Sequence, residues 1–304
     1  TGTGAGARGL EFAIFEGTTP TGPFTKIRSF TKQDLSRPEA PVVSIEGGKL
    51  FVGPSGVEMI VSTEKGIAYP EALGSFQKPG TGVWSIDRIG AASIEALDSA
   101  TMTEVQSSGD GATLHVKDPV VFDSPAGGTA LMFCSHPFGW SSSNTGLAKR
   151  GEGEGEFVLQ TRSVLERGAT WDVACARVTD RLAVPQVGLL AGLPPLSLYF
   201  YDGAECLRSL DENAKAVSRP RGYSCEELGG LAWGWDAEFP KMQRLSLDFP
   251  LFTSPHGTGC SRYVSTLKTQ DGIMATWQQS QPDRSQPLVG NFLDSAAVES
   301  QLAG

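Results

Sequence analysis

Short apolar runs separated by turn residues dominate the chain, and the spacing of an amphipathic helix is scarce. Runs of this length that are rich in β-branched and aromatic residues are typical of strands. They include PVVSIEGGKLFV (41–52), DPVVF (118–122), TALMFCS (129–135), VGLL (187–190) and LSLYFYD (196–202). Short helices are favoured only over LRSLDENAKAV (207–217) and SIEALDSATM (93–102). The pattern therefore predicts an all-β chain.

A repeated motif indicates how these strands are grouped. A glycine followed by leucine or isoleucine, with alanine close behind, recurs five times, beginning at Gly9, Gly66, Gly146, Gly230 and Gly272. A polar turn and a further strand follow each copy, and two strand-like runs precede each of the last four copies. Four antiparallel strands repeated five times predict a five-bladed β-propeller that forms a single domain over residues 1–304. An irregular β-sandwich with coincidental glycines is the alternative.

The five expected blades have unequal lengths. They cover approximately residues 1–30, 38–106, 115–185, 186–247 and 248–295. Only eight residues precede Gly9, too few for two strands and their turn, so we expect the first blade to be incomplete in this chain. By comparison with the other blades, we expect about 30 to 60 further residues upstream in the native protein.

The composition supports many strands and turns and disfavours two kinds of partner. Charged residues make up only 19% of the chain, which contains 37 glycines and 19 prolines. The net charge of −9 and the pI near 5.0 disfavour nucleic acid, whose phosphates are also negative. No apolar stretch reaches the roughly 20 residues of a membrane-spanning helix, so no membrane association is expected. The five cysteines have no metal-binding spacing and leave a cytoplasmic or an exported location open.

Blade geometry predicts that the unusual side chains gather at one end of the strands. In an antiparallel blade, the start of the first strand lies at the same end as the loop between the second and third strands. First strands are expected to start near Glu39, Asp118 and His256. The loops at that end, which include KTQDG (268–272), carry His136, Trp140, Asp202, Glu205, Arg208, Glu226 and Glu227. Loops at one end of a rigid scaffold commonly carry the function, so this end is the expected site.

Four short motifs near these strands resemble the five-bladed propeller glycosidases, the superfamily of the family 43 arabinanases and xylosidases and the family 32 fructosidases. The motifs are TPTGPF (19–24), PEAPVV (38–43), KDPVVFDSPAGGTALMF (117–133) and SPHGTG (254–259). The resemblance implies a central funnel in which three carboxylates act on a glycosidic bond. One would be a base or nucleophile, one a proton donor, and one would tune the pKa of the donor and bind the sugar.

The resemblance also implies roles for particular residues. Glu39 would be the proton donor and Asp118 the tuning acid, while the base would come from the incomplete first blade. Glu205 is an alternative donor, because family 32 places its acid in a Glu-Cys dipeptide, and Glu226 in the longest loop is a further candidate. His256 would help to hold a single structural cation such as Ca²⁺ in the central channel. No other cofactor is expected.

The remaining candidates have a functional and a structural interpretation. His136 and Trp140 suit sugar binding, with the indole ring as a stacking platform, but they also suit core packing. Arg208 and Arg262 are expected to pair with carboxylates of the site or to hold an anionic substrate. The candidate acids can also be solvated loop residues, and the histidine of SPHGTG can be a structural one.

Together these features predict a glycoside hydrolase that acts on a glycan or oligosaccharide through Asp118 with one or two of Glu39, Glu205 and Glu226. Three alternatives stay open: a non-catalytic carbohydrate-binding propeller, a sialidase-like enzyme with six blades, and a glycoside phosphorylase of the mannoside type. VLERGATW (164–171) partly matches the Asp-box of sialidases, which is a structural turn rather than a catalytic motif.

Overall fold

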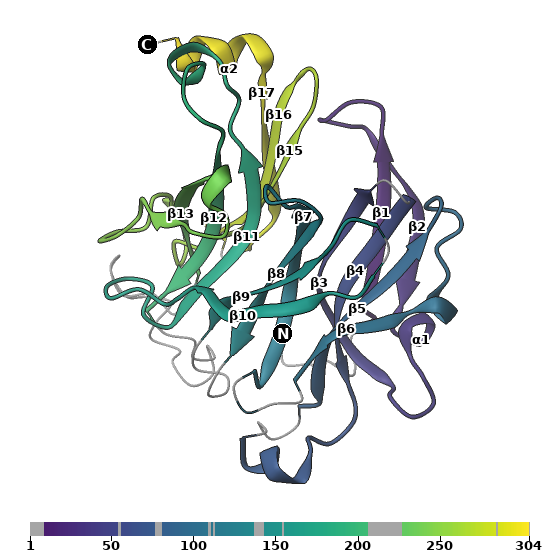
Figure 1. Ribbon diagram of the computed structural model, residues 1–304. Helices are drawn as coiled ribbons and strands as arrows, with labels where there is room; N and C mark the ends of the chain where they lie inside the picture. The colour runs from purple at the N-terminus through teal and green to yellow at the C-terminus, as the bar shows by residue number, and fades with distance from the viewer. Residues whose placement is uncertain are drawn as a thin grey trace. The chain divides into compact units, whose positions relative to one another are not determined.

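The fold is seen in a computed structural model that describes residues 9–53, 56–76, 81–108, 111, 113–136, 143–153, 155–205, 227–283 and 285–303. Contacts within the chain divide it into two compact units (Figure 1). Unit 1 contains residues 1–140 and 145–163, and unit 2 contains residues 141–144 and 164–304.

Unit 1 is built from three antiparallel sheets. The first has two strands, β1 (Glu11–Gly17) and β2 (Phe24–Thr31), and a short helix, α1 (Lys32–Leu35), follows it. The second contains β3 (Val42–Gly53), β4 (Gly56–Lys65), β5 (Val83–Ala91) and β6 (Thr103–Ser107) in chain order. The third contains β7 (His115–Asp123), β8 (Thr129–His136), β9 (Asn144–Arg150) and β10 (Val158–Leu165), also in chain order.

The burial of each strand in unit 1 follows from its place in its sheet. Every residue of β8, in the middle of the third sheet, is buried, because apolar residues occupy both of its faces. Residues of β10, at the edge of the same sheet, alternate between exposed and less exposed positions. One core cluster lies between the first two sheets, around Met59 and Ile89, and another joins the second and third sheets, around Ile60 and Phe133. This packing fixes the first strands β3 and β7 in the interior.

Unit 2 contains two further antiparallel sheets. One consists of β11 (Cys175–Ala183), β12 (Leu196–Ala204), β13 (Leu228–Trp235) and β14 (Gln243–Arg244). The other consists of β15 (Ser261–Lys268), β16 (Gly272–Gln279) and β17 (Leu288–Asp294), and the helix α2 (Ser295–Leu302) follows it. The segment VLERGATW connects β10 to β11, where Trp171 stacks on Tyr201 and donates a hydrogen bond to the carbonyl of Ser246.

The described sheets have the strand order of β-propeller blades, and the expected all-β class is confirmed. Each is a meander in which consecutive strands are antiparallel neighbours, as in a propeller blade. Four of the sheets have three or four strands, whereas β1 and β2 form a two-stranded sheet. Within the described residues there are thus four sheets of blade size rather than the expected five.

Sheet boundaries differ from the expected segments in unit 2. The apolar run VGLL was expected to be a strand, but Gly188–Leu190 form a 3-10 turn in which the Leu189 side chain is 70% exposed. The strand that pairs with β12 is instead β11, so this sheet begins at residue 175 and not at residue 186. Similarly, PLFTS forms only an isolated bridge through Phe252, and β15 is the first strand of its sheet.

The glycine repeat marks close packing rather than a fixed position in a blade. Gly146 and Gly230 lie in the third strands of their sheets, where an added Cβ would come within 2.5 Å of Phe133 and 2.4 Å of Tyr201 respectively. Gly272, however, opens the second strand of its sheet, and Gly66 lies before β5. The loop KTQDG therefore joins a first strand to a second strand, and it lies at the opposite end of β15 from the end that we expected.

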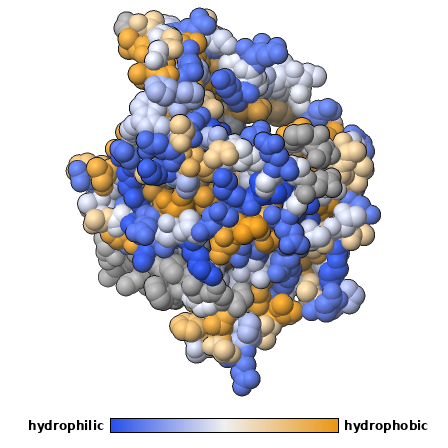
Figure 2. All heavy atoms as spheres, viewed as in Figure 1, coloured by the Kyte–Doolittle hydropathy of each residue, from blue (hydrophilic) through white to orange (hydrophobic). Residues whose placement is uncertain are grey.

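Helices are few and short in the described part of the chain, and none of them has the length and apolarity needed to cross a membrane. The expected helix over 207–217 lies outside the described residues, and the 93–102 segment contains only the 3-10 turn Ser99–Thr101. On the face drawn in Figure 2, hydrophobic residues lie in patches among hydrophilic ones.

Candidate functional site

Asp118 has an unusual backbone conformation near the start of β7. Its φ angle is 54°, in the left-handed region that non-glycine residues seldom adopt, and the register between β7 and β8 shifts between Lys117 and Val120. The Asp118 amide donates a hydrogen bond of 3.3 Å to Ser62 Oγ near the end of β4. The conformation is therefore held by the neighbouring sheet, which fixes the direction of the Asp118 side chain.

Gly47 in β3 makes room for this carboxylate. Its own φ is 61°, and a Cβ added there would lie 2.7 Å from Asp118 Oδ1 and 3.0 Å from Asp118 Cα. Only glycine satisfies both the backbone angle and the close approach. Two left-handed residues on adjacent first strands therefore pack against each other at Asp118.

The residues that directly precede Gly47 and Asp118 in the sequence, Glu46 and Lys117, form an ion pair. Lys117 Nζ forms an ion pair of 3.1 Å with Glu46 Oε2, and it lies 5.5 Å from the centroid of the Trp84 ring. The Lys117 side chain is 15% exposed and that of Glu46 is 42% exposed. We call Glu46, Gly47, Ser62, Lys117 and Asp118 the Asp118 cluster. It combines one buried and one accessible carboxylate with a single ammonium group.

His136 lies deeper, in a buried ring cluster at the end of β8. Its Nε2 is 3.3 Å from Cys134 Sγ, and its ring is in edge contact with His115 at a centroid distance of 5.5 Å. The Tyr69 hydroxyl lies 3.2 Å from His115 Nε2 and donates a hydrogen bond to a backbone carbonyl. Burial raises the pKa of Tyr69 to about 12. These contacts support the core-packing interpretation of His136.

Unit 2 contains a cluster of alternating charges at the corresponding strand ends. Arg177, near the start of β11, forms ion pairs of 2.7 Å with Asp202 and 2.8 Å with Glu227. Arg262, near the start of β15, forms an ion pair of 2.7 Å with the other oxygen of Glu227. The expected pairing of Arg262 with a carboxylate is therefore present. We call Arg177, Asp202, Glu227, Arg262 and Tyr263 the Arg177 cluster.

Tyr263 repeats the backbone geometry of Asp118. Its φ is 56°, and its amide donates to both carboxylate oxygens of Asp202, at 3.1 and 3.2 Å. The guanidinium carbons of Arg177 and Arg262 lie 4.5 and 5.0 Å from the centroid of its ring. In both units, a left-handed residue near the start of a first strand thus donates its amide to a side chain of the preceding sheet's second strand.

The electrostatics of the Arg177 cluster are dominated by burial. Desolvation raises the pKa of Asp202 to about 7 from its ordinary value of 3.8. The Arg177 guanidinium opposes this rise, the nearby Glu227 carboxylate adds to it, and the Tyr263 amide opposes it. Burial also acts to lower the pKa of Arg262, but Glu227 outweighs it and the pKa is raised. The guanidinium groups are thus balanced by carboxylates.

The other expected site residues are more dispersed. Glu39 is exposed in a turn closed by backbone hydrogen bonds between Arg37 and Ala40. Glu205 is half-buried directly after β12. His256 is exposed in the loop before β15, where its amide donates to Ser254 Oγ. Three further expected residues lie outside the described residues: Trp140, Arg208 and Glu226.

Several cluster members were missed as candidates in the sequence. Glu46, Lys117 and Arg177 are charged residues inside otherwise apolar strand runs, and a search for such residues would have found them. The left-handed conformation of Tyr263 has no comparable signal, because non-glycine residues with positive φ are not marked by residue type.

The expected cation ligand gains no support from its surroundings. Among the described residues, no group of three or more His, Cys, Asp or Glu side chains is arranged to hold a metal ion. Ca²⁺ also takes backbone carbonyl and water oxygens as ligands, so the cation expected at His256 stays a prediction.

No family model matches this chain, and no curated protein matches its sequence. Its fold is similar to an α-L-arabinofuranosidase from Lactobacillus brevis, with 11% identity over 90% of this chain and 78% of that chain and a TM-score of 0.53. It is also similar to a family 117 glycoside hydrolase from Zobellia galactanivorans, with 9% identity over 83% and 67% of the two chains and a TM-score of 0.50. A β-1,2-mannobiose phosphorylase from Listeria innocua has 12% identity over 92% of this chain and 65% of that chain, with a TM-score of 0.50. These neighbours share the fold and are carbohydrate-active proteins.

Proposed function

We propose that this chain is a glycoside hydrolase in which Asp118 is a catalytic carboxylate. The observation that carries the proposal is the Asp118 cluster, in which a buried carboxylate stands on a left-handed residue held by Ser62, and the residues that precede Gly47 and Asp118 form an ion pair. The fold shared with carbohydrate-active proteins supports the class, but a fold hosts many activities, so the proposal depends on the cluster.

The chemistry requires two carboxyl groups with different roles. One protonates the leaving oxygen while the other activates water or attacks the sugar. Asp118 is buried and Glu46 is accessible, and carboxylates in different environments can take different roles. Lys117 balances one negative charge and offers a hydrogen-bond donor to a sugar hydroxyl. Glu46 is therefore the first candidate for the acid that works with Asp118.

The acids expected from the sequence remain candidates. We propose Glu39 as an alternative partner of Asp118, and an acid from the first blade of a five-bladed propeller as a third carboxylate. Glu205, directly after β12, and Glu226, which lies outside the described residues, are proposed as substrate-binding or catalytic acids, to be tested by substitution with glutamine.

We propose water rather than phosphate as the acceptor. A phosphorylase needs cations available to phosphate, and in the Arg177 cluster both guanidinium groups are engaged by Asp202 and Glu227. Turnover should therefore be independent of added inorganic phosphate. A strict requirement for phosphate would favour the phosphorylase alternative.

The test is the substitution Asp118→Asn, assayed with nitrophenyl glycosides of arabinofuranose, xylose, galactose and mannose. We expect turnover to fall by at least about 100-fold, because a positioned acid or base contributes about 10² to 10⁴. Stability should be unchanged, because asparagine tolerates left-handed φ. Asp248→Asn, at an exposed residue outside the cluster, is the matched control. Full turnover in Asp118→Asn would refute the role of Asp118, and sugar binding without turnover in the wild type would favour a non-catalytic propeller.

A further inference from the structure

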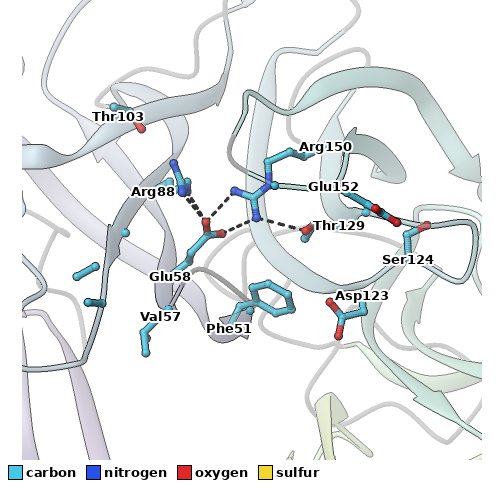
Figure 3. A pocket seen from close by; sticks show the side chains of 18 of the residues that line it. Phe51, Val57, Glu58, Arg88, Thr103, Asp123, Ser124, Thr129, Arg150 and Glu152 are labelled. Carbon is cyan, nitrogen blue, oxygen red and sulfur yellow. Dashed lines mark hydrogen bonds and ion pairs between the residues drawn. The ribbon is translucent and has the colours of Figure 1, made fainter.

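A cavity of about 890 Å³ lies in unit 1 at the strand ends opposite to Asp118. It is lined by the turn between β3 and β4, the end of β5, the turn between β7 and β8 and the residues after β9 (Figure 3). Asp118 is near the start of β7, whereas Asp123 at the other end of that strand lines the cavity. The volume is within the range of small-molecule pockets, about 300 to 1,000 Å³.

The back of the cavity is a rigid charged network. Figure 3 shows the Glu58 carboxylate between the guanidinium groups of Arg88 and Arg150. Arg88 Nε donates to Glu58 at 2.9 Å, and Arg150 donates at 2.7 Å to one oxygen and 3.0 Å to the other. Burial alone would raise the pKa of Glu58, but the hydrogen bonds from Arg150 and Arg88 outweigh it and lower the pKa. Arg150 also donates to Thr129 Oγ1 at 3.2 Å and lies 4.7 Å from the Phe157 ring centroid.

The rest of the lining is typical of a site for neutral hydroxylated ligands. Exposed carboxylates of Asp123 and Glu152 are hydrogen-bond acceptors for hydroxyl groups, and the ring of Phe51 offers an apolar surface. The hydroxyl groups of Thr101, Thr103, Ser124 and Thr129 add donors and acceptors. The charged lining side chains are three carboxylates and two guanidinium groups, and the guanidinium groups are already paired. An anionic ligand would therefore be repelled by Asp123 and Glu152.

We propose that this cavity is a second saccharide-binding site, separate from the Asp118 cluster, which takes a neutral sugar or a short neutral oligosaccharide. The carboxylates of Asp123 and Glu152 bind hydroxyl groups of the sugar, and Phe51 packs against a face of the ring. This inference does not depend on the proposed hydrolase activity, because a non-catalytic chain would bind sugar here equally well.

The experiment measures binding of D-xylose, L-arabinose, D-galactose, D-mannose and D-galacturonate to the full chain by saturation-transfer NMR, followed by calorimetry. Gly151→Trp adds an indole ring to the lining of the cavity, and the Cβ of the new residue would meet nothing within 4 Å. Gly192→Trp is the matched control, because Gly192 is also unobstructed and does not line the cavity. Glu152→Gln removes one acceptor charge, and Asp118→Asn tests the other site.

We expect a neutral sugar to bind the wild type and Gly192→Trp equally, and Gly151→Trp to remove the binding that belongs to the cavity. Binding at the proposed Asp118 site is a separate component, which Asp118→Asn should weaken and Gly151→Trp should leave unchanged. Glu152→Gln should weaken the cavity component about tenfold, because a neutral amide oxygen replaces a charged acceptor. The inference is overturned if no neutral sugar binds, if Gly151→Trp leaves all binding unchanged, or if galacturonate binds in place of the neutral sugars. Binding that is lost in Asp118→Asn but not reduced in Gly151→Trp would overturn this site and still support the proposed function.

Discussion

Gly47→Ala tests whether the close packing of β3 and β7 positions Asp118. The substitution adds one methyl group at a residue with φ of 61°, where the new Cβ would lie 2.7 Å from Asp118 Oδ1 and 3.0 Å from Asp118 Cα. The first of these contacts is with a side chain, but the second is with backbone in a buried strand. The methyl group therefore has to displace β3, β7 or both.

The expected loss in the free energy of unfolding is about 3 kcal/mol. Left-handed φ costs an alanine about 1 to 2 kcal/mol. Overpacking in a close-packed interior adds about 1 to 3 kcal/mol. Alanine also lowers the conformational entropy of the unfolded chain, which reduces the expected loss by about 0.4 to 1 kcal/mol. For a chain of 304 residues, the Tm should fall by about 5 °C.

The assay is urea and thermal unfolding of wild type, Gly47→Ala, Asp118→Gly and the double variant. Removal of the Asp118 side chain relieves the 2.7 Å contact, so the two substitutions should be coupled by more than about 0.5 kcal/mol. Gly74→Ala is the control, since an added Cβ there meets nothing within 4 Å and φ is not positive. Wild-type stability in Gly47→Ala, or additivity in the double variant, would refute the packing argument.

Two further predictions concern buried charges. Because burial raises the pKa of Asp202 above its ordinary value of 3.8, the folded chain binds this proton more tightly, and stability should fall as the pH rises from about 4 to 7. Asp202→Asn should flatten this part of the curve in urea unfolding at a series of pH values, and an unchanged slope would contradict the assignment. Arg150→Met leaves Glu58 with Arg88 alone and should lower stability by about 3 kcal/mol in thermal unfolding. Adding Glu58→Gln should recover part of that loss, and no recovery would show that Glu58 is not the source.

The hydrophobic pattern was sufficient to predict the strands of unit 1, but it was not sufficient to predict those of unit 2. DPVVF and TALMFCS became β7 and β8, because continuous burial of a strand requires a continuous apolar run. CARVTDRLA became β11 although it alternates with charge, since Arg177 bonds to Asp202 and Glu227 inside the fold. VGLL is apolar but forms an exposed turn. Apolar content alone does not identify strands whose charges are paired in the interior.

The site could be predicted only in part, because its geometry depends on residues from other strands. An acid directly before a proline made Asp118 a candidate. Its conformation, however, depends on Ser62 in β4 and Gly47 in β3, which are distant in the sequence. The pairing of Arg262 with a carboxylate was predictable from charge, whereas the sequence did not indicate that Glu227 is its partner. Local sequence indicates which residue types are available, and the neighbouring strands decide which of them meet.

Asp118 and Tyr263 have the same left-handed backbone geometry, but the carboxylate occupies a different position in each arrangement. In unit 2, the carboxylate of Asp202 is the acceptor, is fully buried, and is bound by Arg177 and by the Tyr263 amide. Such a group has its oxygens occupied and cannot exchange protons with a substrate without breaking those bonds. In unit 1, the acceptor is the Ser62 hydroxyl, and the carboxylate stands on the left-handed residue Asp118 itself, with 7% exposure. The acid thus stands on the acceptor residue in unit 2 and on the donor residue in unit 1, and this difference is why the proposed function is tested at Asp118 before Asp202.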